Sequence, residues 1–383
     1  MRTTNEKSSM SRRSFLANAA TVGVVLPSLL DAAANGAAVV ATEAEPLRLH
    51  RNESSYGLHP AAAEALRNAG TAKPHRYPIE EPVTLVEALA KRFGVTKENV
   101  VLGAGSLEIL RMATEAFCSP SRGAIVAEPT FEAVVSFCPL AHARAVKIPL
   151  TKDHKHDMPR ILRAASGRAG MIFFCNPSNP VGTFIDKVEV ERFVRRLPRG
   201  VVLLADEAYY DYVESPAYES CLRFVKEGLP VVVSRTFSKI YGMAGLRVGY
   251  AIGRKDLIKR MADLRLGNSP NQVATAAALA AHNQDDWIDR VRKLNSEVRD
   301  YLTRELRAMG LAPIPSQANF VMTDLGRPVK PAIETLKQRH VLVARLFPSM
   351  PNHMRVGLGT MAEMKLFLKE FRDVMGNQPA SPS

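Results

Sequence analysis

The feature that most constrains the fold is a recurring order of apolar run, turn and helical pattern between residues 99 and 253. Short, wholly apolar runs predict strands that are buried on both faces, and the helical patterns between them predict crossover connections. The sequence therefore predicts an α/β fold with a mostly parallel central sheet, in which ligands bind at the carboxyl ends of the strands. The expected strands cover residues 99–102, 124–127, 170–174, 201–205 and 231–233.

The turn after residues 231–233 gathers hydroxyl groups around one lysine. Ser234, Thr236 and Ser238 precede Lys239, and Arg247 follows eight residues later among glycines. A phosphate ester is bound by hydroxyl donors, a cation and glycines that let the backbone approach. A lysine that forms a Schiff base also needs a nearby cation and shelter from water, because both lower its pKa. We therefore expect a phosphate site with a reactive lysine rather than a surface loop with a solvated one.

The pattern S-x-T-x-S-K followed by G-x-x-G-x-R-x-G resembles the lysine segment of the class I/II aminotransferases, and is most similar to the histidinol-phosphate aminotransferase branch. The resemblance covers roughly residues 47–374. It implies a fold-type I transferase with pyridoxal 5'-phosphate as cofactor, its aldehyde held by Lys239. Thr236, Ser238 and Arg247 would then grip the cofactor phosphate.

A second phosphate-binding segment is expected after residues 99–102. A glycine turn here leads from a strand into a helix, where backbone N–H groups and the positive helix end favour an anion. The candidates are Ala104, Gly105 and Ser106.

Four further residues are candidates for contact with the cofactor ring. Asp206 ends a buried apolar run, where a carboxylate is poorly solvated unless it meets a cation such as a protonated ring nitrogen. By resemblance Tyr209 contacts the ring hydroxyl, and Phe131 stacks on the ring where relatives often have tyrosine. The rigid turn N-P-S-N-P-V-G at residues 176–182 carries Asn179, which by resemblance contacts the ring oxygen. Glu207 is expected to be structural.

Substrate residues are also implied by resemblance. Arg355 lies in M-R-V-G-L-G-T, similar to a family segment whose arginine clamps the substrate carboxylate, and a guanidinium meets a carboxylate with two parallel bonds. Arg345 matches a second arginine that contacts a distal anion in relatives acting on phosphate esters. Asn52 and Tyr56 belong to a pocket-lining segment that departs from the family pattern at Ser54 and Ser55. That departure leaves the substrate open.

The first forty residues differ from the rest of the chain. A charged start with Arg12 and Arg13, an apolar middle and small residues resemble a twin-arginine export signal, whose machinery moves folded proteins. We expect a periplasmic or exported protein that folds and acquires its cofactor in the cytoplasm. The alternative is a disordered tail with a chance arginine pair. The expected units are a signal peptide at 1–41, a large cofactor-binding domain at 77–284, a smaller α+β domain from 42–76 and 285–375, and a disordered tail at 376–383.

Composition excludes some other classes. The net charge of +13 is dispersed, and no zinc or RNA-binding motif accompanies it, so nucleic-acid binding is not expected. The four cysteines lack metal-site or disulfide-framework spacing. We expect buried free thiols and no metal, with a single disulfide left open.

The predicted activity is the transfer of an amino group between an L-amino acid, or an amino-alcohol phosphate such as histidinol phosphate, and a 2-oxo acid. Lys239 would act first as base and then as acid. By resemblance Tyr77 reaches the partner's cofactor phosphate in a homodimer with active sites at the interface. Two alternatives remain: a decarboxylase of the phosphothreonine type with the same fold, and a non-catalytic exported binding protein.

Overall fold

The computed structural model describes residues 45–72, 74–165 and 167–376. The expected signal peptide at 1–41 and residues 377–383 of the expected tail lie outside the described residues. Gly376, which was expected in the tail, is the last residue of helix α13.

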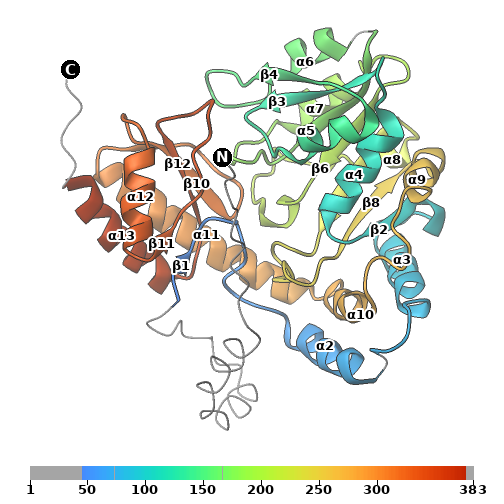
Figure 1. Ribbon diagram of the computed structural model, residues 1–383, viewed down its shortest axis with the longest axis horizontal. Helices are drawn as coiled ribbons and strands as arrows, with labels where there is room; N and C mark the ends of the chain where they lie inside the picture. The colour runs from blue at the N-terminus through green and yellow to red at the C-terminus, as the bar shows by residue number, and fades with distance from the viewer. Residues whose placement is uncertain (1–44, 73, 166, 377–383) are drawn as a thin grey trace, which may run out of the picture. The chain divides into compact units, whose positions relative to one another are not determined.

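A seven-stranded sheet of order β2-β8-β7-β6-β5-β3-β4 forms the centre of the larger domain (Figure 1). Only β8 runs antiparallel to its neighbours, so the predicted mostly parallel sheet is confirmed. The sequence interpretation did not predict β4 or β8. The strands are β2 (Val100–Gly103), β3 (Gly123–Glu128), β4 (Ala145–Pro149), β5 (Ala169–Cys175), β6 (Val202–Asp206), β7 (Val231–Thr236) and β8 (Gly249–Gly253).

Helices cover both faces of this sheet because the strands are apolar on both. Alternate residues of one strand enter different clusters: Phe173 packs with α4, α5 and α9, and Phe174 packs with the helices on the opposite face. The helices of this domain are α2 (Pro60–Ala72), α3 (Glu80–Phe93), α4 (Ser106–Phe117), α5 (Ala133–Phe137), α6 (Met158–Ala165), α7 (Lys187–Val194), α8 (Leu222–Lys226), α9 (Lys255–Ala262) and α10 (Gln272–Ala281), with 3-10 helices η2 (Lys97–Asn99), η3 (Cys138–Ala141) and η4 (Tyr210–Tyr212).

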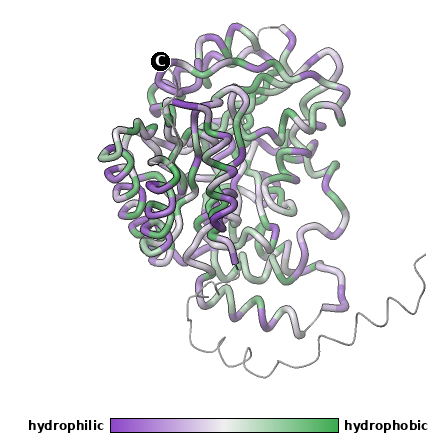
Figure 2. Tube along the Cα trace, turned by 60° about the vertical axis from the view of Figure 1, so that its left-hand side comes forward, coloured by the Kyte–Doolittle hydropathy of each residue, from purple (hydrophilic) through white to green (hydrophobic). Residues whose placement is uncertain are grey.

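The smaller domain is built on an antiparallel sheet of order β12-β10-β9 and a parallel pair β1-β11. Apolar residues of β10 and β12 pack against three amphipathic helices, whose residues alternate between hydrophobic and hydrophilic along their length (Figure 2). The elements are β1 (Leu47–Arg48), α11 (Asp285–Ala308), β9 (Ala312–Pro313), β10 (Phe320–Asp324), α12 (Lys330–Gln338), β11 (Val341–Leu342), β12 (His353–Gly357) and α13 (Met361–Gly376).

Two segments connect the domains. Helix α11 enters the large-domain core through Ile288 and Val291 and the small-domain core through Leu302 and Leu306, and so bridges the two domains. The segment 42–76, expected as a whole with the small domain, is divided: β1 pairs with β11 there, whereas Ala62 of α2 packs in the large-domain core, where α2 lies against α10. The small apolar side chains of α2 fit that helix contact, which the domain prediction did not weigh.

All four cysteines are buried free thiols, as expected from their scattered spacing. Within the described residues, no helix is long and apolar enough to cross a membrane.

Candidate active site

A cavity of about 1100 Å³ lies where the carboxyl ends of β3, β5, β6 and β7 meet residues of the small domain. Most of the predicted site residues line it together: Asn52, Ser106, Phe131, Asn179, Asp206, Tyr209, Thr236, Ser238, Lys239, Arg247, Arg345 and Arg355. The topology brings them to one edge because parallel strands end on the same side of the sheet.

Lys239 follows β7 and is held by the segment before α2. Its Nζ donates to the carbonyl oxygens of Asn52 at 3.0 Å and Arg51 at 3.3 Å. Burial lowers the pKa of Lys239 to about 8, with Arg355 and Arg247 acting in the same direction. A lysine with a lowered pKa is a better nucleophile and proton acceptor near neutral pH.

Asp206 ends β6 and is 2% exposed. Burial raises the pKa of Asp206 to about 7, and its Oδ1 has no hydrogen-bond partner among the described residues. A carboxylate in this position is unstable as a charge unless a cation reaches it from the cavity. The site therefore fits a ligand that presents a protonated nitrogen to Asp206.

A buried chain of polar groups joins the two domains across the cavity. The Tyr209 hydroxyl accepts from Asn52 Nδ2 at 3.1 Å and Asn179 Nδ2 at 3.3 Å, and Asn179 Oδ1 accepts from Arg355 Nη1 at 2.7 Å. The arrangement places a phenol and an amide in the same cavity as Asp206 and links both to the arginine of β12. Burial raises the pKa of Tyr209, so the phenol keeps its proton.

The expected phosphate cup is built around Arg247. Its Nη1 donates to Ser238 Oγ at 3.2 Å and to the Ala244 carbonyl at 2.8 Å. Gly105 adopts φ +74°, and a Cβ there would lie 2.2 Å from Arg247 Nη2, so only glycine allows this approach. The cup fits an anion held by a guanidinium, a hydroxyl and a helix amino end.

Ala104 departs from the prediction. Its N–H donates to the buried Glu108 carboxylate at 2.6 Å and so is not free for a phosphate, and the residue does not line the cavity. The same carboxylate accepts from Leu266 N and Ser269 Oγ. Glu108 therefore ties the cup to the loop before α10, and the sequence interpretation did not anticipate this.

Two predicted residues lie elsewhere. Tyr56 does not line the cavity; it packs against the large-domain core, and burial together with Glu363 and Glu297 raises its pKa to about 12. Tyr77 is 77% exposed and also lies away from the cavity. Its expected role at a partner's site stays a prediction.

Arg355 and Arg345 differ in their partners. Arg355 is 8% exposed and donates only to neutral oxygens, Asn179 Oδ1 and the His50 carbonyl at 2.9 Å, while its Nε has no partner among the described residues. Burial lowers the pKa of Arg355 to about 10. Arg345 instead makes an ion pair with Glu132.

Several residues of the site were not predicted. Asn319 donates to the carbonyls of Asn52 and Glu53 at 3.0 and 3.1 Å and so holds the segment that binds Lys239. The signal available in the sequence was an asparagine directly before the apolar run at residues 320–322. Glu132 and Phe347 also line the cavity; Glu132 follows the predicted Phe131, but no local pattern indicated its partner in the other domain.

Glu207 is structural, as expected. It is 2% exposed and accepts from Arg235 at 2.9 and 3.1 Å, from Ser220 and from the Cys221 N–H. The bonds from Arg235 join the carboxyl end of β7, which precedes Lys239, to the carboxyl end of β6, which carries Asp206.

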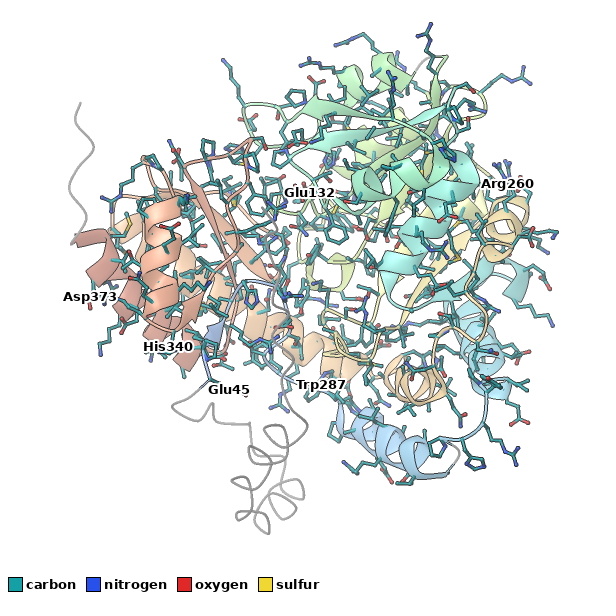
Figure 3. The ribbon with its side chains drawn as sticks, viewed as in Figure 1. Glu45, Glu132, Arg260, Trp287, His340 and Asp373 are labelled. Carbon is teal, nitrogen blue, oxygen red and sulfur yellow. The ribbon has the colours of Figure 1, made fainter. Side chains whose placement is uncertain are left out.

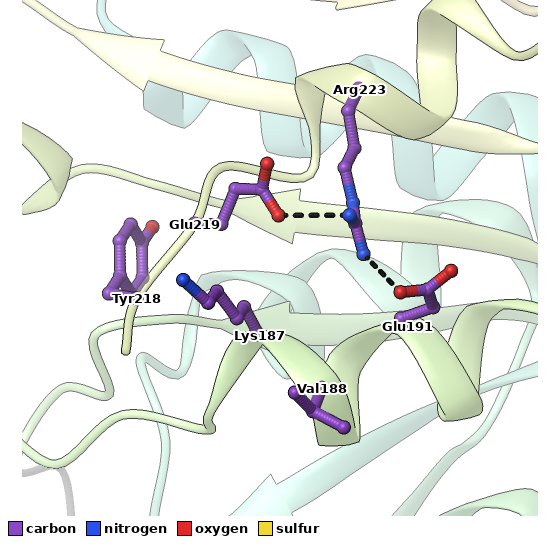
Figure 4. A pocket seen from close by; sticks show the side chains of 6 residues that line it. All are labelled: Lys187, Val188, Glu191, Tyr218, Glu219 and Arg223. Atoms are coloured by element: carbon purple, nitrogen blue, oxygen red, sulfur yellow. Dashed lines mark hydrogen bonds and ion pairs between the residues drawn. The ribbon is translucent and has the colours of Figure 1, made fainter. Parts of the chain in front are cut away.

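A second hollow of about 490 Å³ lies between α7 and the segment that leads into α8 (Figure 4). Its charges are satisfied within the chain, since Arg223 pairs with Glu191 and Glu219 and Lys187 donates to the Pro216 carbonyl. It contains none of the predicted site residues. The described part of the chain has no group of three or more histidine, cysteine or acidic side chains that could hold a metal.

Comparison with known proteins defines the class. Residues 44–371 match the family Aminotransferase class I and II. The chain is 34% identical over 332 residues to the histidinol-phosphate aminotransferase of Moorella thermoacetica, covering 86% of this chain and 85% of that protein. The structure of histidinol-phosphate aminotransferase from Sinorhizobium meliloti in complex with pyridoxal-5'-phosphate has a TM-score of 0.81 at 25% identity, covering 96% of this chain and 99% of that one. A tetra mutant of Thermus thermophilus aspartate aminotransferase gives a TM-score of 0.75 at 25% identity, covering 86% and 97%.

The chain belongs to the aminotransferase class I and II family. It is a pyridoxal-phosphate-dependent aminotransferase with the fold-type I architecture. The residues present fit this cofactor: the unpartnered Asp206 oxygen suits its ring nitrogen, Lys239 its aldehyde, and the cup around Arg247 its phosphate.

Proposed function

We propose that this aminotransferase moves an amino group between an L-amino acid and a 2-oxo acid, with Arg355 holding the carboxylate of each. The carrying observation is that Arg355 is a buried guanidinium with no carboxylate partner among the described residues. A buried cation without a counterion is costly, and a bidentate carboxylate removes that cost.

The reaction divides between cofactor and chain. When bound, pyridoxal phosphate supplies a ring that accepts the electron pair released at the substrate's α-carbon. Asp206 keeps the proton on the ring nitrogen, and Arg355 orients the carboxylate. Lys239 Nζ would take the proton from the substrate's α-carbon and would give it back to the carbon on the other side of the transferred nitrogen. Its pKa of about 8 suits both the base and the acid role.

A second donor is supported by the relatives. Moorella and Sinorhizobium proteins of similar sequence and fold are named histidinol-phosphate aminotransferases. Arg345 and Arg355 lie beside the same ring, Phe347, so the chain offers two guanidinium groups to a phosphate. We therefore include an amino-alcohol phosphate such as histidinol phosphate as the alternative amino donor.

We infer that the chain works as a homodimer, which is typical of the family. Tyr77, Ile79 and Val83 are 77%, 72% and 53% exposed on one short segment. Exposed apolar side chains that gather in this way are usual at a protein interface. A second copy would cover them and receive Tyr77 at its cofactor phosphate.

We further propose that residues 1–41 direct export by the twin-arginine route to the periplasm, after the chain has folded and bound its cofactor in the cytoplasm. The proposal rests on the arginine pair followed by an apolar stretch. Replacing Arg12 and Arg13 by lysine in a reporter fusion should retain the protein inside the cell. Continued export would count against it.

The test of the activity is a half-reaction of the purified holoenzyme with single amino donors. We expect the near-ultraviolet or visible absorption band of the bound cofactor to disappear as an equal amount of product forms, which is the 2-oxo acid for an L-amino acid and the corresponding ketone phosphate for histidinol phosphate. Release of carbon dioxide in place of an oxo acid would instead identify a decarboxylase.

A further inference from the structure

The mouth of the cavity holds an ion pair that joins the two domains. Glu132 lies at the amino end of α5, on the side of the large domain that faces the small domain (Figure 3). Arg345 follows β11 in the small domain, and its Nη2 donates to the Glu132 carboxylate. Both side chains line the cavity and are about half exposed, at 52% and 54%.

Arg345 is also a neighbour of the arginine proposed to bind the substrate carboxylate. The guanidinium carbons of Arg345 and Arg355 lie 4.8 and 5.4 Å from the centre of the Phe347 ring. The two cations repel each other, and this repulsion contributes to the lowered pKa of Arg355. Among the described residues, Glu132 is the carboxylate that makes an ion pair with either of these two arginines, and it pairs with Arg345 rather than with Arg355.

We propose that Glu132 is a specificity-determining residue: it occupies Arg345 as a resident carboxylate, which the distal anion of a two-anion substrate displaces. The substrate's first anion binds Arg355 and its second binds Arg345. A substrate with a neutral distal group leaves the Glu132–Arg345 pair in place. This inference rests on the proposed function, since it assumes that Arg355 holds the first anion.

The energetics allow such an exchange. An exposed ion pair contributes only about 0.2–1 kcal/mol, so a substrate anion can replace Glu132 at little cost. In the absence of that anion, Glu132 keeps Arg345 neutralised next to Arg355. One cavity can therefore accept donors with and without a distal charge, as an enzyme that uses two different substrates in turn requires.

The direct test is equilibrium binding to the holoenzyme of ligands that do not react. Glutarate has two carboxylates, and butyrate has one and a similar chain. For Glu132→Gln we expect the ratio of butyrate to glutarate dissociation constants to rise about two- to fivefold, because the competing carboxylate is gone. For Arg345→Gln the same ratio should fall about tenfold or more, because a cation that binds a carboxylate is lost. Glu334→Gln, which removes a surface pair with Lys330 on α12, is the matched control and should leave the ratio at the wild-type value.

Kinetics with paired donors identify the source of the distal anion. The ratio of kcat/KM for L-glutamate over L-glutamine reports a distal carboxylate, and that for O-phospho-L-homoserine over L-homoserine reports a distal phosphate, since all four donors keep the first anion, the α-carboxylate. We expect Glu132→Gln to raise, and Arg345→Gln to lower, the ratio for the pair that the enzyme uses.

The proposal is overturned if Glu132→Gln leaves the glutarate ratio unchanged or lowers it, or if Arg345→Gln weakens both ligands equally. Failure of the proposed function looks different. In that case no donor transfers its amino group to the wild-type enzyme, whereas the two variants still shift the glutarate ratio in opposite directions.

Discussion

The inner end of the cavity and its mouth differ in whether their charged side chains are paired within the chain. At the inner end Asp206 and Arg355 are 2% and 8% exposed and have no oppositely charged partner among the described residues. At the mouth Glu132 and Arg345 are half exposed and paired with each other. All four side chains line the same continuous cavity.

The difference separates permanent from exchangeable contacts. Burial raises the pKa of Asp206 and lowers those of Lys239 and Arg355, so the charged form of each group is destabilised in the cavity. Ligands that supply the missing charge are bound by relieving that cost. At the mouth the chain supplies its own counterion, so contact with Arg345 adds little binding free energy for a ligand and mainly affects selectivity between ligands.

The largest effect should come from Arg355→Gln. Removing a buried guanidinium that binds a carboxylate costs about 2–5 kcal/mol, so kcat/KM for every amino-acid donor should fall by about thirtyfold or more. Steady-state kinetics with several donors would check this. A loss confined to donors with a distal anion would mean that Arg355 binds the distal anion and not the α-carboxylate, which would contradict the roles given to the two ends of the cavity.

Gly105→Ala tests the close packing of the phosphate cup. The added Cβ would lie 2.2 Å from Arg247 Nη2 on a backbone with φ +74°. Such strain costs about 1–3 kcal/mol, so the affinity for pyridoxal phosphate should fall about tenfold. Gly70→Ala is the control, because its Cβ would meet nothing within 4 Å. Equal cofactor affinities in the two variants, measured by titrating the cofactor-free enzyme, would contradict the assignment of the cup.

The third prediction concerns the cofactor-free protein and pH. Asp206 has a pKa of about 7 when folded and about 3.9 in the unfolded chain. Between these values the unfolded chain loses the proton and the folded one keeps it, so raising the pH favours unfolding. Relative to Asp206→Asn, wild type should lose up to about 1.4 kcal/mol of unfolding free energy per pH unit from pH 4 to 7.

Denaturant titrations at several pH values measure this difference. Adding the cofactor should remove it, since the ring nitrogen then provides the cation. Parallel pH profiles of the two cofactor-free proteins would show that Asp206 is not held in a costly state.

The smallest effect is expected at the mouth. Glu132→Gln should change the unfolding free energy by less than about 1 kcal/mol, because its ion pair is half exposed. A larger loss would mean that the pair holds the domains together, and the two ends of the cavity would then be more alike than the structure indicates.

The sequence predicted the inner end far better than the mouth. Asp206, Asn179 and Lys239 follow strands whose apolar runs are local signals, and parallel pairing then places them on one edge. The Glu132–Arg345 pair depends on how the small domain meets the large one, which no short segment encodes.

The same limit explains the remaining differences. Strand β4 is interrupted by the exposed Lys147 and so lacks a continuous apolar run. Strand β8 is antiparallel to β2 and β7 because of how it pairs with them, which its own sequence does not encode. The N–H of Ala104 is used by Glu108, whose position follows from the packing of the loop before α10.

The most direct test of the central claim is mass spectrometry of the native enzyme after reduction with borohydride. The account predicts that the peptide containing Lys239 gains the mass of the reduced cofactor, and that Lys239→Ala loses both this adduct and the amino-transfer activity. An adduct on a different lysine, or none on a fully active enzyme, would contradict it.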